Sequence, residues 1–153
     1  VGSTFWFTLP LDTKRTDIEL SPYILVQSEE TPRSDRHHSI LIAEDVYENY
    51  FLLETLFGKQ YQLYHALNGQ EAIDMFETYH PDLILMDIKM PVMDGFEATR
   101  RIRTLSKTIP IIALTAFAFE REKEIAKQCE FTDYVVKPID IKELKKLIVK
   151  VLA

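Results

Sequence analysis

Four short apolar runs in this chain end in side chains that can bind a cation or take part in a reaction. These side chains are Glu44 and Asp45, Asp87, Thr115, and Lys137. When such runs form parallel strands, their carboxyl ends meet at one edge of the sheet, and ligands bind there. The sequence therefore predicts three carboxylates, a hydroxyl and an ammonium at one place.

Three neighbouring carboxylates repel one another, so their cluster requires either a raised pKa or a bound cation. An open, oxygen-rich cluster that keeps water molecules suits Mg²⁺ better than Zn²⁺. With the metal bound, Asp87 could attack a phosphoryl group while Mg²⁺ and Lys137 offset charge on the transferring oxygens. The product would be an aspartyl phosphate, and the Thr115 hydroxyl could donate to it and so sense the modification.

Each of these residues alone has a simpler interpretation. A single aspartate at a strand end is usually a helix cap or a loop carboxylate, and a single threonine there is usually structural. Their joint placement at the ends of four runs is far less expected by accident, and it favours a functional site.

The elements that must position these side chains begin near residue 39, where apolar runs alternate with amphipathic helical patterns. The predicted strands are 39–44, 61–66, 83–87, 111–115 and 133–136. This alternation is typical of parallel strands joined by crossover helices. The first, third and fourth strands are apolar on both faces, so they are predicted to be central. The predicted fold is a doubly wound α/β sheet of five parallel strands with helices on both faces.

Five helices are predicted between and after these strands, at 46–57, 69–80, 96–105, 119–129 and 141–151. Gly58 stands where a left-handed C-cap would end the first helix. Pro81 disfavours helical geometry at His80 and so ends the second. Asp140 is the predicted cap of the fifth, whose lysines are most simply a solvated face.

The bulk composition fits one domain of ordinary polarity. With 153 residues, a net charge of −6 and a pI near 5.2, the chain is not expected to bind nucleic acid or an anionic membrane. The single Cys129 excludes an internal disulfide and is predicted to be a buried small side chain. The chain lacks an apolar stretch of membrane-spanning length and the order of a signal peptide, so we expect a cytoplasmic location.

Residues 1–38 do not continue the alternation. Residues 13–38 are rich in polar and charged side chains and are predicted to be a linker. Before them, residues 2–10 have the aromatic pattern of a strand without a partner strand nearby in the sequence. Such a strand is expected to stay disordered or to pair with a sheet edge, including that of another molecule in a homodimer.

The strand ends and the loops after them carry a set of motifs that resembles the response-regulator receiver domain over residues 39–153. The motifs are Glu44-Asp45, the decapeptide 86–95 (MDIKMPVMDG), the tetrapeptide 113–116 (ALTA) and the hexapeptide 133–138 (DYVVKP). The resemblance implies a flavodoxin-like sheet of strand order 2-1-3-4-5. It also implies Mg²⁺-dependent transfer of a phosphoryl group from a phosphohistidine to Asp87, which drives a conformational switch.

The same resemblance implies a role for each site residue. Asp45, Asp87 and the Lys89 carbonyl would bind Mg²⁺ directly, and Glu44 would help through water. Lys137 would pair with the phosphoryl group.

Two further residues would form the switch that the resemblance implies. Thr115 would be drawn toward phosphorylated Asp87, and the ring of Tyr134 would turn inward into the space that Thr115 leaves.

Two positions depart from the receiver pattern. Glu44 replaces the more frequent Asp with a longer side chain. Residues 129–132 (CEFT) stand where receivers commonly have a Gly and a small residue. Because a non-Gly residue at positive φ is costly, we expect this turn to be reshaped.

Residues 2–10 resemble the final glycine-containing strand of a histidine kinase ATP-binding domain. This implies a remnant strand at 1–12, a linker at 13–38 and a receiver at 39–153, within a hybrid sensor kinase anchored in the inner membrane. The fragment would catalyse at most its own phosphorylation and dephosphorylation. Its partners would be a phosphohistidine donor domain, of its own chain or another, and a histidine phosphotransfer protein.

Two other classes of function are weighed against this one. Haloacid dehalogenase-like phosphatases also use an aspartyl nucleophile and a metal, but they place a second Asp two residues later, where this chain has Lys89. A receiver-like scaffold that works without phosphorylation is the other alternative, which the complete acidic set disfavours.

Overall fold

The computed structural model describes residues 37–116 and 130–153. The chain divides into two units between Arg33 and Ser34, and every described residue belongs to the second unit. The predicted N-terminal strand and linker, the fourth predicted helix and Cys129 lie outside the described residues, apart from the linker's last two residues.

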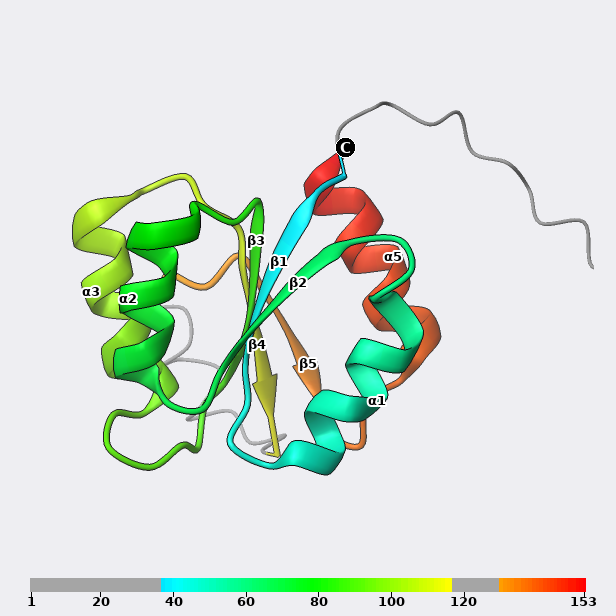
Figure 1. Ribbon diagram of the computed structural model, residues 1–153, viewed down its shortest axis with the longest axis horizontal. Helices are drawn as coiled ribbons and strands as arrows, with labels where there is room; N and C mark the ends of the chain where they lie inside the picture. The colour runs from blue at the N-terminus through cyan, green and yellow to red at the C-terminus, as the bar shows by residue number, and fades with distance from the viewer. Residues whose placement is uncertain (1–36, 117–129) are drawn as a thin grey trace, which may run out of the picture. The chain divides into compact units, whose positions relative to one another are not determined.

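Five parallel strands form one sheet in the order β2-β1-β3-β4-β5 (Figure 1). Their bounds are β1 Ser39–Ala43, β2 Gln62–Ala66, β3 Leu83–Asp87, β4 Ile111–Thr115 and β5 Asp133–Val136. The predicted fold class and strand order are therefore confirmed, and β1 and β2 are each one residue shorter than predicted. Three strands, β1, β3 and β4, are almost wholly buried because helices cover both of their faces.

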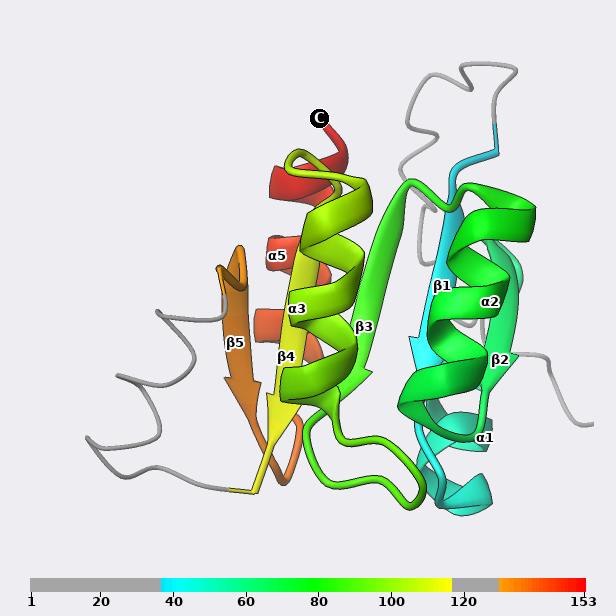
Figure 2. The ribbon, with the colours of Figure 1, turned by 90° about the vertical axis from the view of Figure 1, so that its left-hand side faces the viewer.

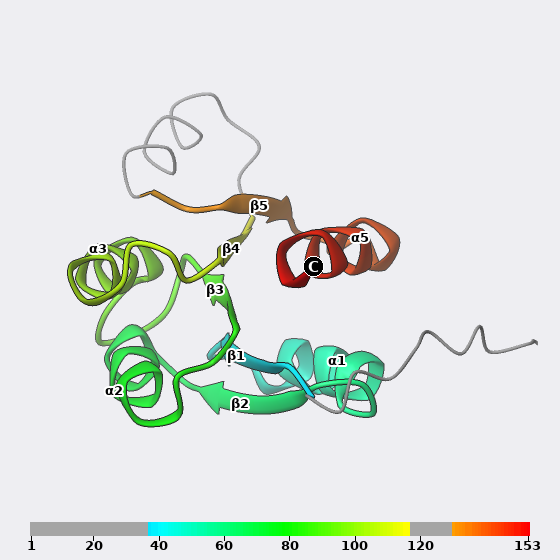
Figure 3. The ribbon, with the colours of Figure 1, turned by 90° about the horizontal axis from the view of Figure 1, so that it is seen from above.

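In the part of the chain that the structure describes, helices lie on both faces of the sheet (Figure 3). On one face lie α2 (Gly69–Tyr79) and α3 (Gly95–Leu105), and on the other lie α1 (Tyr47–Phe57) and α5 (Ile141–Leu152). Alternate strand residues point to opposite faces, so Leu41 joins the core beneath α2 and α3, whereas Ile40 and Ile42 join the core beneath α1 and α5. None of the described helices has the length and apolar character of a membrane span.

Side-chain caps begin three of these helices and so fix where the loops of the carboxyl edge end. Asn68 accepts from the Glu71 N–H and Asp94 from the Glu97 N–H. Asp140, the predicted cap of α5, accepts from the N–H groups of Lys142 and Glu143, which confirms the prediction.

The two predicted helix stops have different outcomes. His80 ends α2 in the left-handed conformation, with φ 47°, just before Pro81. The left-handed cap predicted at Gly58 is wrong, because Gly58 has φ −62° and ψ −17° and continues a right-handed turn. A glycine is needed there for space instead, since a Cβ would lie 2.7 Å from the Glu54 carbonyl oxygen.

Candidate functional site at the carboxyl edge of the sheet

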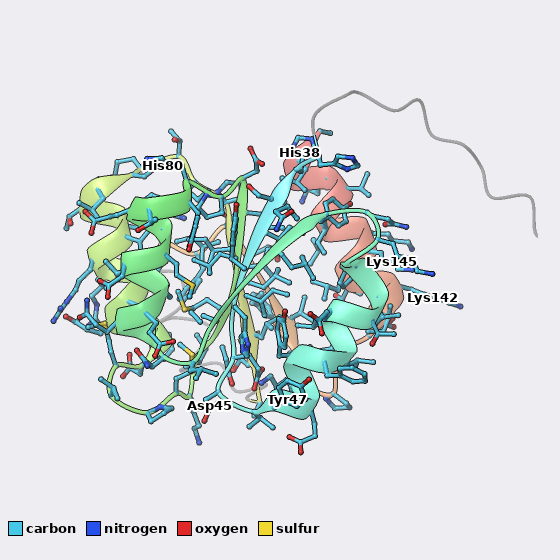
Figure 4. All side chains as sticks on the ribbon, viewed as in Figure 1. His38, Asp45, Tyr47, His80, Lys142 and Lys145 are labelled. Carbon is cyan, nitrogen blue, oxygen red and sulfur yellow. The ribbon has the colours of Figure 1, made fainter. Side chains whose placement is uncertain are left out.

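The carboxyl ends of the parallel strands lie along one edge (Figure 2), and three acids meet there. Glu44 and Asp45 directly follow β1, and Asp87 is the last residue of β3. One carboxylate oxygen from each of the three lies within 4.8 Å of the others. Glu44 is fully buried and Asp87 is 6% exposed, whereas Asp45 faces solvent at this edge (Figure 4).

Lys137, which directly follows β5, connects two of these acids. Its Nζ donates to Glu44 Oε2 at 2.7 Å and to Asp87 Oδ2 at 2.9 Å. Burial by itself would lower the pKa of Lys137, but the hydrogen bonds and charges of Glu44 and Asp87 outweigh it and raise this pKa above its ordinary value. The ammonium thus supplies the positive charge that two buried carboxylates need.

The loop after Asp87 is held close to the end of β3. The Lys89 N–H donates to Asp87 Oδ1 at 3.3 Å, and the Lys89 side chain is exposed. The Gly95 N–H donates to the Ile88 carbonyl at 2.9 Å. A Cβ on Gly95 would collide with the carbonyl oxygen of Asp87, so this return of the chain requires glycine.

Thr115 lies on β4, the strand next to Asp87, and Tyr134 lies on β5, the edge strand beyond β4. Thr115 ends β4, and its carbonyl accepts from the Lys137 N–H at 2.6 Å. Tyr134 pairs with Ala113 across β4 and β5, and its side chain is 38% exposed. The inward turn of Tyr134 concerns a second state of the domain and stays a prediction.

Two residues beside the acids were not predicted from the sequence. The Asn49 side chain donates to Glu44 Oε1 at 2.8 Å, and His65 Nε2 lies 2.8 Å from the Glu44 carbonyl oxygen. The His65 ring also stacks on Tyr50, with centroids 3.7 Å apart. Asn49 could have been suspected as a polar residue in the first turn of the helix after the acids, whereas nothing in the sequence indicates the role of His65.

The donor set fits a hard divalent cation. Three carboxylates converge, and one of them is open to water, which Mg²⁺ retains in its coordination shell. The same arrangement places a nearly buried carboxylate, Asp87, beside an ammonium that can bind a phosphoryl oxygen. These are the chemical requirements of an aspartyl nucleophile.

The chain is similar in sequence and in fold to known proteins. A curated relative, the sporulation initiation phosphotransferase F of Bacillus subtilis (strain 168), is 34% identical over 117 residues, which cover 76% of this chain and 94% of the relative. The sensor protein EvgS of Escherichia coli (strain K12) is 32% identical over 148 residues, or 95% of this chain. The chain spans only 12% of EvgS and 25% of another curated relative.

A solved structure, the receiver domain of the sensor histidine kinase PA1611 of Pseudomonas aeruginosa PAO1, has a magnesium ion coordinated in its active site cleft. It is 33% identical, with a TM-score of 0.71, and the match covers 76% of this chain and 98% of that one. The family model of the response regulator receiver domain matches residues 40–149. The family receives phosphoryl groups from histidine kinases or phosphotransfer proteins and binds Mg²⁺ at an acidic site. The chain therefore belongs to the response regulator receiver domains of two-component signalling.

Proposed function

We propose that Asp87 is the phosphoacceptor of this receiver and that the transfer from a phosphohistidine depends on Mg²⁺. A carboxylate oxygen of Asp87 forms the new bond to phosphorus, and the phosphorus–nitrogen bond to the donor imidazole breaks. The observation that carries this proposal is the position of Asp87, at the end of β3 and 2.9 Å from Lys137 Nζ. The acids Glu44 and Asp45 lie beside it.

In this proposal Asp45, Asp87 and the Lys89 carbonyl hold Mg²⁺, and Glu44 assists through water. When bound, the cation offsets negative charge on the transferring phosphoryl oxygens. Two observations support this assignment, namely the cluster of three carboxylates and the magnesium ion in the PA1611 receiver domain.

The chain's own residues then supply the positioning and the response. Lys137, now bound to Asp87 Oδ2, would pair with a phosphoryl oxygen after transfer. Thr115 would donate its hydroxyl to the same group, and Tyr134 would turn inward. Charge and packing together would then favour the second conformation of the domain.

For the parent protein, we propose a hybrid sensor kinase. Residues 1–12 would be the last strand of its ATP-binding domain, residues 13–38 a linker, and residues 39–153 the receiver. The similarity to EvgS supports this arrangement, because it covers 95% of the chain and so extends well before residue 40, where the family match begins.

Several properties of this chain depend on that parent. The receiver would work in the cytoplasm, and the parent would be anchored in the inner membrane. The phosphodonor would be a phosphohistidine domain of the same chain or another, and a histidine phosphotransfer protein would accept the phosphoryl group next.

Deleting residues 1–12 and measuring the solution mass tests whether the isolated strand makes a homodimer.

The experiment for the phosphoacceptor is intact-mass spectrometry after incubation with Mg²⁺ and a small acyl phosphate. The protein should gain the mass of one phosphoryl group, and neither Asp87→Asn nor a metal-free sample should gain it. Asp74→Asn, which changes an exposed aspartate on α2, is the matched control and should react normally. A gain in Asp87→Asn would contradict the assignment. No gain in any sample, with Mg²⁺ bound, would favour a scaffold that works without phosphorylation.

A further inference from the structure

Glu44 is a fully buried carboxylate whose two oxygens have different partners. Oε2 accepts from the Lys137 ammonium at 2.7 Å, and Oε1 accepts from the Asn49 amide at 2.8 Å. The Val46 N–H is a more distant donor to Oε1, at 3.4 Å. Among the described residues, Asn49 is therefore the close, uncharged side-chain partner of the Glu44 carboxylate.

Asn49 is well placed to hold Glu44 because the helix fixes its backbone. It lies in the first turn of α1, and its own N–H donates to the Val46 carbonyl at 3.1 Å. Its neighbours Tyr47 and Glu48 are exposed, whereas Asn49 is half-buried. Side chains in a helix point toward its N-terminus, which here is the side on which Glu44 lies.

Lys137, the other side-chain partner of Glu44, also binds a second carboxylate. The Lys137 ammonium donates to both Glu44 and Asp87. In the proposed reaction it also binds the phosphoryl group. A glutamate has one more rotatable bond than an aspartate, so its carboxylate loses more freedom when it is held in one place. A donor that stays on Oε1 while Lys137 moves would keep this longer side chain directed at the acidic cluster.

We propose that Asn49 is a positioning residue for the Mg²⁺ site, acting through its hydrogen bond to Glu44. This inference deepens the proposed function and rests on it. Asn49 would touch neither the cation nor the phosphoryl group. Loss of a hydrogen-bond partner behind a metal ligand typically weakens metal binding by about 10-fold to 100-fold. Because Glu44 is proposed to act through water, we expect Mg²⁺ binding to weaken by the lower value of this range, about 10-fold.

The test is calorimetric titration of Mg²⁺ into four proteins: the unaltered chain, Asn49→Ala, Glu44→Gln and the double variant. Alanine has a higher helix propensity than asparagine, so Asn49→Ala should keep α1 folded. Asn49→Ser provides a second variant, whose hydroxyl is too short to reach Glu44. The Kd for Mg²⁺ should rise about tenfold in Asn49→Ala, and much less when the substitution is made in the Glu44→Gln background.

Gln70→Ala is the matched control. Gln70 also lies in the first turn of a helix and donates from its amide to a carboxylate, Asp74 Oδ1, at 2.9 Å. Gln70→Ala should leave the Kd for Mg²⁺ unchanged. A metal-free readout is the ¹H–¹⁵N signal of the Asn49 side-chain amide, which should shift in Glu44→Gln and stay in place in Glu71→Gln.

Each outcome decides the inference. An unchanged Kd in Asn49→Ala and Asn49→Ser would overturn it, and so would an equal loss with and without Glu44. Absence of Mg²⁺ binding by the unaltered chain would overturn both the inference and the proposed metal site. Normal Mg²⁺ binding without transfer to Asp87, judged by intact mass, would overturn the proposed phosphoacceptor and leave the calorimetric result on Asn49 standing.

Discussion

The Arg103 side chain in α3 donates from Nε to the backbone carbonyl of Glu130 at 2.9 Å. Arg103 is only 6% exposed, and its Nη1 also donates to the Ile109 carbonyl at 2.8 Å. Burial lowers the pKa of Arg103 from its ordinary value, and the negative charge of Glu130 partly opposes this effect. One buried guanidinium thus fixes both the loop before β4 and the turn before β5.

Replacing Arg103 should destabilise the domain. Arg103→Met removes the donor of a buried contact with the Ile109 carbonyl and of a partly buried contact with the Glu130 carbonyl. We therefore expect a loss of about 3 kcal/mol in the free energy of unfolding. Urea denaturation measures it. Arg100→Met, which changes an exposed arginine of the same helix, is the control and should change the stability by less than about 0.5 kcal/mol. Equal effects of the two variants would show that Arg103 is not the anchor.

Glu130 lies in the turn that we expected to be reshaped, yet it adopts the left-handed conformation, with φ 57°. Glycine pays no Cβ penalty there, so Glu130→Gly should be about 1 kcal/mol more stable than Glu130→Ala. The comparison with alanine removes the exposed ion pair to Lys107 from both variants. Thermal unfolding of the two proteins gives the answer, and a more stable alanine variant would rule out strain at this position.

Removing the Lys137 ammonium should make stability depend strongly on Mg²⁺. Lys137→Met leaves Glu44 and Asp87 without their cation, which should cost about 3 kcal/mol in the presence of a chelator. A bound Mg²⁺ would restore positive charge to the cluster. The rise in Tm on adding Mg²⁺ should therefore be larger in Lys137→Met than in the unaltered chain. The same rise in both proteins would argue against a cation at these carboxylates, and Lys150→Met is the control.

The Tyr50 hydroxyl should lose its proton at a higher pH than an ordinary tyrosine does. Burial raises the pKa of Tyr50 to about 12 from 10.0, helped by its hydrogen bond to Glu54 at 2.9 Å. Between these two pKa values the folded state keeps a proton on Tyr50 that the unfolded state releases. The contribution of protonated Tyr50 to the stability of the fold is therefore complete below pH 10.0 and is lost as the pH rises toward about 12.

Tyrosinate absorbance measures this titration directly. Tyr50→Phe should remove a component near pH 12, and Glu54→Gln should move it to lower pH, because the carboxylate charge that opposes ionisation is gone. Burial also raises the pKa of Tyr61, so Tyr61→Phe is needed as the control and should retain the component of Tyr50. An unchanged curve in Tyr50→Phe would contradict the assignment.

Much of this molecule follows from its sequence. The bounds of β3, β4 and β5, the central position of the strands that are apolar on both faces, and the cap at Asp140 were all predicted. Each depends on local signals: the alternation of apolar runs and helices, and residues that start or stop a helix. The meeting of Glu44, Asp45, Asp87 and Lys137 followed from one further rule, that parallel strands end at the same edge.

Only the tertiary structure determined which side chains hold these residues in place. Arg103 reads in the sequence as one more charged residue beside Arg100 and Arg101, yet it is buried against Glu130. The sequence likewise did not predict the contact of Asn49 with Glu44 or the right-handed turn at Gly58. Such contacts depend on side-chain rotamers and on the close approach of segments that are far apart in the sequence. Packing in the folded state determines both, and a periodic sequence pattern predicts neither.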